Sequence, residues 1–181
     1  MTEVRVARPD EFDRVGELTV AAYRLLPVDH LWGGYDADIL DTSARAEHAD
    51  VLVAVVDGDV VGSVTLVADA ASPWSEWTEA GEVQFRLLAV DAAARGRGIG
   101  ETLVRACITR AGGAPIMIHT TPWMETARRM YDRLGFVRHP DRDVPYDEWH
   151  RPEIDNLPAE WVGQSFLAYT LTSPARPAAS G

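Results

Sequence analysis

Lysine is absent from this sequence, and cysteine nearly so. All 17 basic residues are arginines, which excludes a phosphate-binding P-loop and a pyridoxal Schiff-base enzyme, because both depend on a lysine amine. The single cysteine cannot form an internal disulfide or a multi-cysteine zinc site. The histidines are scattered along the chain, so we expect no bound metal.

Long apolar segments are also lacking. No apolar run approaches the ~18–20 residues that cross a bilayer. Charged residues interrupt the first 25 positions, where a signal peptide would place its apolar stretch. We therefore expect a cytoplasmic protein without a membrane partner.

Basic charge is in short supply, with 28 acidic residues against 17 basic ones and a net charge of −11. This balance disfavours nucleic acid as a partner, since such binding depends on neutralising phosphates. A length of 181 residues with 46% hydrophobic residues is typical of one globular domain. We expect that domain over residues 1–172 and a flexible tail over 173–181, with the oligomeric state left open and a homodimer as one alternative.

The apolar pattern predicts a mixed α/β architecture. An Asp-Gly turn at 57–59 between two apolar runs predicts a hairpin, whereas the later strands are joined through helical patterns, which indicates a mixed sheet of about seven strands with helices on both faces. A first helix is expected from its cap at Asp10 to the stop at Pro27. The other expected helices are 36–48, 99–111 and 123–134, and the expected strands are 3–7, 51–56, 60–67, 83–90, 115–119, 136–138 and 164–171.

A glycine-rich turn at 95–100 carries the strongest chemical signal. It follows the apolar strand 83–90 and opens directly into a helix, so its backbone N–H groups and the helix dipole can bind a phosphate or pyrophosphate. Arg95 and Arg97 add positive charge beside it. A tight turn with two solvated arginines is the alternative, and a dinucleotide fingerprint fits less well because Glu101 stands where a glycine is needed.

Two motifs make the sequence resemble the GNAT superfamily of acetyl-CoA-dependent N-acetyltransferases. The pattern Gln/Arg-x-x-Gly-x-Gly/Ala of that family is met by Arg95-Gly96-Arg97-Gly98-Ile99-Gly100. The pattern Ala-x-x-x-Tyr-x-x-x-Gly-Phe is met by Ala127, Tyr131, Gly135 and Phe136. The resemblance implies a GNAT-like central sheet that is splayed between its fourth and fifth strands.

The resemblance also implies roles for individual residues. Acetyl-CoA would be the co-substrate, its pyrophosphate held by the glycine-rich turn and its pantetheine arm paired with the backbone of strand 83–90. Tyr131 would be the general acid that protonates the departing thiolate. The expected cofactor-binding residues are Leu88, Ala89, Val90, Arg95, Gly96, Arg97, Gly98, Ile99 and Gly100.

A general base must also take a proton from the acceptor ammonium. Some family members use a glutamate at the position of Gln84, which cannot act as a base. Glu82 lies two residues earlier on the same strand face, and we expect it to act through a water molecule. His119, at the end of the next expected strand, is the competing candidate.

The loops that build the acceptor site in this family are acidic here. Residues 28–50 hold six acids against one arginine, and residues 139–163 hold seven against two. This charge, with tryptophans such as Trp74 and Trp77 in nearby loops, indicates a small cationic amine as acceptor, although acidic loops also serve solubility. Two alternatives remain: a catalytically idle acyl-CoA-binding or sensor domain, and a protein N-acetyltransferase acting on a basic segment.

Overall fold

Eight strands of the described residues form one mixed sheet. The computed structural model describes residues 1–26, 35–146 and 163–172. The strand order is β1-β2-β3-β4-β5-β8-β6, with β7 paired to β8, and among these described strands only the β4–β5 pairing is parallel. The strands are β1 (Glu3–Val6), β2 (Asp50–Val56), β3 (Asp59–Val67), β4 (Val83–Val90), β5 (Ile116–Thr120), β6 (Val137–Arg138), β7 (Val144–Pro145) and β8 (Ser165–Leu171).

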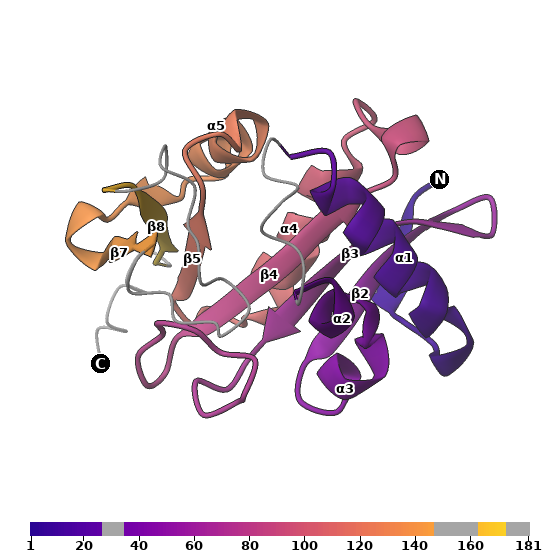
Figure 1. Ribbon diagram of the computed structural model, residues 1–181, viewed down its shortest axis with the longest axis horizontal. Coiled ribbons are helices and arrows are strands. Elements are labelled where there is room, and N and C mark those ends of the chain that lie inside the picture. Colours follow the sequence, from indigo (N-terminus) through magenta and orange to yellow (C-terminus); the bar gives the residue numbers. More distant parts are fainter. Residues whose placement is uncertain (27–34, 147–162, 173–181) are drawn as a thin grey trace, which may run out of the picture.

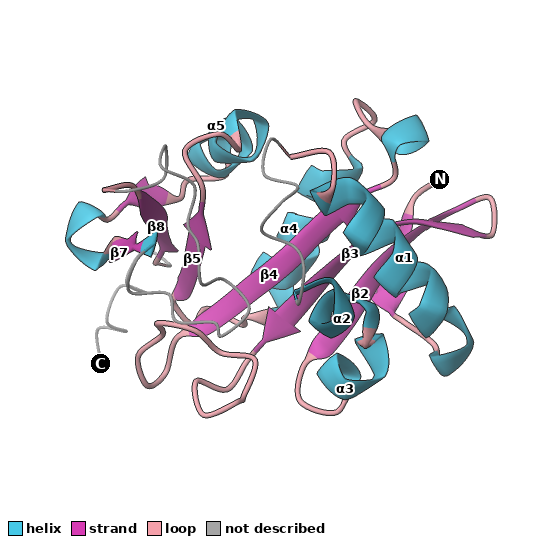
Figure 2. Cartoon of the chain, viewed as in Figure 1, coloured by secondary structure: helices cyan, strands magenta, loops and turns pink. Residues whose placement is uncertain are grey.

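Helices cover both faces of this sheet, as predicted (Figures 1 and 2). Helix α1 packs with α2 and α3 on one face, and α4 lies on the other, where its core cluster also includes side chains of α5. The bounds are α1 (Phe12–Tyr23), α2 (Tyr35–Leu40), α3 (Thr42–Ala46), α4 (Ile99–Arg110) and α5 (Glu125–Arg133). No helix of the described ranges is long and apolar enough to cross a membrane.

The continuous apolar run of β2 reflects burial on both of its faces. Leu52 and Ala54 point into the core beneath α4, together with Leu103. Their neighbours Val51 and Val53 point into the second core, beneath α1. A strand between two helical layers has no solvent face, so its sequence is apolar without alternation.

Two of the predicted segments need correction. The expected single helix over 36–48 is broken into α2 and α3, because the carboxylate of Asp41 accepts a hydrogen bond from the Ala44 amide (2.9 Å) and caps a new helix. The segment after residue 138 was expected to run without a strand, but it contributes β7, which pairs with β8 through Val144 and Pro145. The expected tail, 173–181, lies outside the described residues.

Glu11, rather than the expected Asp10, anchors the start of α1. The Glu11 carboxylate accepts hydrogen bonds from the Arg5 guanidinium (2.7 and 2.8 Å) and from the Arg8 amide (2.8 Å). Its side chain is buried, and the hydrogen bonds from Arg5, with smaller contributions from Arg8, lower its pKa from 4.5 to about 2. The ion pair therefore ties β1 to the first helical turn.

Replacing Glu11 should make stability depend on pH. Because the folded-state pKa lies below the unfolded one, the charge of Glu11 stabilises the fold above pH 4.5, and this contribution is lost as the pH falls toward about 2. Glu11→Gln should lower the free energy of unfolding by about 2 kcal/mol at pH 7, and the deficit should shrink below pH 4.5. Urea unfolding at several pH values measures it, with Glu17→Gln on the exposed face of α1 as control. A deficit that does not change with pH would contradict the argument.

Candidate active site

The parallel strands β4 and β5 separate after two residue pairs. Only Val83–Ile116 and Gln84–Met117 are in register, so the remaining six residues of β4 have no partner on β5. Figure 1 shows the two strands close at one end and apart at the other, with α5 at the open end. The predicted splay between the fourth and fifth strands is thus confirmed.

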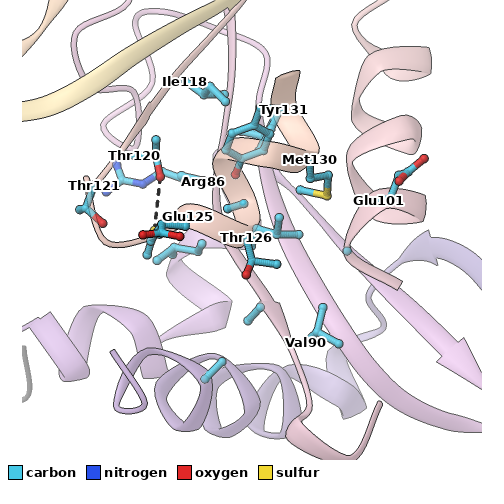
Figure 3. A pocket seen from close by; sticks show the side chains of 18 of the residues that line it. Arg86, Val90, Glu101, Ile118, Thr120, Thr121, Glu125, Thr126, Met130 and Tyr131 are labelled. Carbon is cyan, nitrogen blue, oxygen red and sulfur yellow. Dashed lines mark hydrogen bonds between the residues drawn. The ribbon is translucent and has the colours of Figure 1, made fainter. Parts of the chain in front are cut away.

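A cavity of about 1100 Å³ occupies this opening. It is lined along β4 from Gln84 to Val90, on the opposite side by the end of β5, and at one end by the glycine-rich turn and α5. Figure 3 shows side chains from these elements gathered around it, among them Val90, Thr120, Thr126 and Tyr131. One continuous space therefore joins the glycine-rich turn to the side chains of β5.

A bulge distorts β4 where it borders the cavity. Ser63 of β3 pairs with Ala89 and Thr65 pairs with Arg86, so Leu87 and Leu88 together oppose one residue of β3. Leu87 has φ +55°, an unfavourable conformation for a leucine. A bulge leaves a residue unpaired in the ladder, which frees backbone polar groups of β4 for a ligand in the cavity.

The glycine-rich turn leads into the N-terminus of α4 as predicted. Gly96 and Gly98 both have φ +76° and open space where a Cβ would lie. Gly98 caps α4 without a side-chain hydrogen bond, and the first helical bond runs from the Thr102 amide to the Gly98 carbonyl (3.0 Å). The preceding amides of α4 are therefore available to an anion.

Most of the expected cofactor-binding residues line the cavity, but Arg97 does not. Sequence reasoning missed two arginines of α5, Arg129 and Arg133, which do line it. A guanidinium nitrogen of Arg133 lies 3.4 Å from a carboxylate oxygen of Glu101, and one of Arg129 lies 2.5 Å from a carboxylate oxygen of Glu125. The sequence could have indicated this pair, because a spacing of four residues places both arginines on one side of a helix.

Tyr131, the expected general acid, belongs to α5. Its ring packs against Phe85, Phe136 and Tyr169, and it borders the cavity. In Figure 3 its hydroxyl points toward the surrounding lining side chains. Burial raises the pKa of Tyr131 well above its ordinary value of 10, so the phenol keeps its proton at neutral pH.

Glu82 does not line the cavity. Its two carboxylate oxygens accept hydrogen bonds from Arg142 (2.5 and 3.0 Å), and one also accepts from the Glu79 amide (2.8 Å). Burial raises the pKa of Glu82, but the hydrogen bonds and charge of Arg142 outweigh it, so that the pKa lies below its ordinary value. The competing candidate, His119, lines the cavity at the end of β5.

The loop before β4 forms a fixed wall beside His119. Gln84 exchanges two hydrogen bonds with the backbone of Glu76 (2.9 and 3.1 Å), and Arg86 donates to the Trp74 carbonyl (2.9 Å). Trp77, which has φ +57°, packs edge-on against His119 with ring centroids 4.9 Å apart. Gln84 thus holds this loop in place.

The acidic segments expected to attract a cationic acceptor do not contribute described residues to the cavity lining. Their described acids form ion pairs with arginines outside the cavity lining instead, including Asp36 with Arg24, Asp50 with Arg110 and Asp143 with Arg138. The stretches 28–34 and 147–162 of these segments lie outside the described residues. At the His119 end, the lining carries Glu76 paired with Arg86 (3.1 Å).

Cys107 is a core residue of α4. Its side chain is fully buried, and burial raises the pKa of its thiol to about 12, so it is a poor nucleophile. Within the described ranges, no group of three or more histidine, cysteine or acidic side chains could hold a metal ion.

Comparison with known proteins identifies the class. The chain belongs to the acetyltransferase (GNAT) family, whose model matches residues 13–136, more than half of the chain. It is thus an acetyl-CoA-dependent acetyltransferase, as the two motifs indicated. A search of the curated proteins found no match.

Solved structures share the fold. A Corynebacterium glutamicum protein described as histone acetyltransferase HPA2 and related acetyltransferase has 22% identity and a TM-score of 0.69, covering 98% of each chain. The yncA protein of Salmonella typhimurium, a candidate acetyltransferase solved with its cofactor acetyl-CoA, has 17% identity and a TM-score of 0.65 over 99% of each chain. The IAA acetyltransferase of Bacillus cereus has 16% identity and a TM-score of 0.64, covering 96% of this chain and all 100% of its own.

Gly100 allows a test of the anion site at the start of α4. A Cβ there would make ordinary contacts, 3.6 Å from Val90 and 4.0 Å from Met130, so Gly100→Ala should fold and bind acetyl-CoA within a few-fold of wild type. Gly100→Asp suits a helix N-terminus but sets a carboxylate against the coenzyme phosphates, and should weaken binding at least about tenfold. Calorimetric titration measures both. Equal affinity of the two variants would place the phosphates elsewhere.

Proposed function

We propose that this protein transfers the acetyl group of acetyl-CoA directly to the primary amine of a small acceptor, with both substrates bound together. The observation that carries this proposal is the continuity of the cavity from the glycine-rich turn, past Tyr131, to His119 and Trp77. Such a space can hold a thioester and an amine side by side, which makes a direct transfer accessible.

The residues at the glycine-rich end fit the coenzyme. The free amides after Gly98 and the side chains of Arg95, Arg129 and Arg133 are suited to its phosphates. The unpaired backbone of β4 through Leu88 and Val90 is suited to its amide-bearing arm. When bound, acetyl-CoA supplies an acetyl thioester whose carbonyl carbon the amine attacks.

The bulge in β4 is suited to polarising that carbonyl. Backbone groups around Leu87 and Leu88 are released from the ladder with β3, and a fixed N–H donor to a developing oxyanion stabilises it by about 3 kcal/mol. The strained φ of Leu87 supports this role, because strained backbone is retained mainly where function requires it.

Tyr131 is the general acid of the proposed reaction. The departing sulfur takes the Tyr131 hydroxyl proton as the C–S bond breaks and the C–N bond forms. The nitrogen loses one proton before the attack, and this proton passes to solvent. It loses a second proton as the amide forms, and this second proton restores the phenol. Burial holds the phenol in its neutral form, so Tyr131 carries the proton that the departing thiolate takes.

The acceptor end favours a small amine with an apolar or ring-bearing body. Trp77 and Phe166 pack together (5.2 Å between ring centroids) and both line the cavity. Aromatic faces can contact both a ring and an ammonium group. The Glu76–Arg86 pair supplies balanced charge beside them.

Turnover with a panel of primary amines tests the proposal. Free CoA should be released only when acetyl-CoA and a suitable amine are both present, and mass spectrometry should find one acetyl group on the amine. Since the chain has no lysine, acetylation of its own side-chain amines cannot confuse the readout. Tight acetyl-CoA binding without turnover would indicate an idle sensor domain, and turnover with basic peptides alone would indicate a protein acetyltransferase.

Tyr131→Phe should separate chemistry from packing. The ring contacts remain, but the acidic proton is lost, so kcat should fall about 100-fold with little change in KM or Tm. Tyr169→Phe is the matched control, because Tyr169 packs against Tyr131 (6.3 Å between ring centroids) but does not line the cavity. Equal losses in both variants would assign Tyr131 a packing role.

A further inference from the structure

One nitrogen of His119 is held by backbone. The ring Nε2 lies 3.1 Å from the carbonyl oxygen of Arg142. A carbonyl oxygen can only accept, so Nε2 must carry the hydrogen and donate it. In the neutral ring, Nδ1 is then the atom with the free lone pair.

The partner of His119 is itself held firmly. Arg142 ends the 3₁₀ turn Pro140–Arg142, and its guanidinium donates to both oxygens of Glu82 and to the Trp77 carbonyl (3.1 Å). The side chains of Arg142 and Glu82 are only 19% and 12% exposed. A two-point contact of this kind, shielded from water, fixes the Arg142 backbone that meets His119.

The other nitrogen of His119 is unused. Nδ1 is buried and has no hydrogen-bond partner among the described residues, although His119 borders the cavity. A buried acceptor without a donor is destabilising. An N–H group of a molecule in the cavity would remove that cost.

Charged and uncharged groups surround the His119 ring. Arg142 and Asp143 face it from the turn, Glu76 and Glu82 from the loop and start of β4, while the Trp77 ring and the β8 partner Ala168 are uncharged. Burial and the positive charge of Arg142 lower the pKa of His119 below its ordinary 6.5, although the hydrogen bond to the Arg142 carbonyl and the charges of Asp143 and Glu76 act to raise it. The ring is therefore neutral at pH 7 and able to accept a proton.

We propose that Nδ1 of His119 takes the first proton of the acceptor ammonium, and that Arg142 and Glu82 are positioning residues which fix the ring in the tautomer that leaves the lone pair of this nitrogen free. The inference rests on the N-acetyltransferase function proposed above. The proton passes from the ammonium to Nδ1 and then to solvent, leaving a neutral amine to attack. Glu82 thereby acquires a different role from the expected one, since both of its oxygens are occupied by Arg142.

The tautomer can be measured without any substrate. In ¹⁵N-histidine-labelled protein, the His119 signals, assigned by their loss in His119→Gln, should report hydrogen on Nε2 and none on Nδ1 at pH 7. In Glu82→Gln the Arg142 contact weakens, and the signals should move toward a mixture of tautomers. Hydrogen on Nδ1 in the wild-type protein would overturn the proposal.

Turnover supplies the second test. The glutamine amide in His119→Gln can still donate to the Arg142 carbonyl but offers no basic nitrogen. The value of kcat/KM for an alkylamine should therefore fall about 100-fold at pH 7. The acid limb of the wild-type pH profile, with its midpoint below 6.5, should disappear in this variant. The loss should shrink for weakly basic amines such as anilines, which are already deprotonated. His139→Gln, outside the cavity lining, should behave as wild type.

The outcomes separate the two proposals. Wild-type protein that turns over no amine would defeat the proposed function, while the tautomer measurement would still stand. Wild-type turnover with an unchanged His119→Gln profile would defeat the role of His119 alone. An acid limb removed by Glu82→Gln but kept in His119→Gln would return the base to Glu82, and an equal loss with alkylamines and anilines would make His119 a structural residue.

Discussion

The brevity of the contact between β4 and β5 is the constraint on which the rest of this molecule depends. Two residue pairs hold the strands together, and beyond them the backbone of each strand must find other partners, because an unpaired polar backbone in the interior is costly. An aromatic cluster of Phe85, Tyr131, Phe136 and Tyr169 connects β4 to α5 and β8 through side-chain packing. The sheet stays intact around an opening whose edges remain free to bind.

The two ends of this opening are built by different kinds of interaction. At one end, glycine conformations and the start of α4 present backbone donors with little help from side chains. At the other end, polar side chains hold the wall of the cavity in place. Gln84, Arg86 and Arg142 each form a hydrogen bond with a backbone group of the loop 74–77. The first arrangement suits a substrate shared across a family, whereas the second can change from one member to another and set the choice of acceptor.

Much of the fold could be predicted because its elements are encoded locally. The strand boundaries of β4 and the start of α4 match the sequence prediction, since an apolar run, a glycine-rich turn and an amphipathic repeat follow one another. The break at Asp41 was missed because a capping carboxylate inside a helical pattern also reads as a surface residue. The two residues of β7 were missed because pairing with β8, and no intrinsic pattern, makes them a strand.

The sequence by itself determined the family, the glycine-rich turn before α4 and the position of Tyr131 on α5, because each depends on residues close together in the chain. Only the tertiary structure decided the surroundings of Glu82 and His119. Arg142 lies 60 residues from Glu82 and 23 from His119, yet it occupies the carboxylate of one and orients the ring of the other. Spacing along a strand predicts which face of the sheet a side chain takes. The tertiary fold decides which group that side chain meets, and so whether a carboxylate is paired and which imidazole nitrogen keeps a free lone pair.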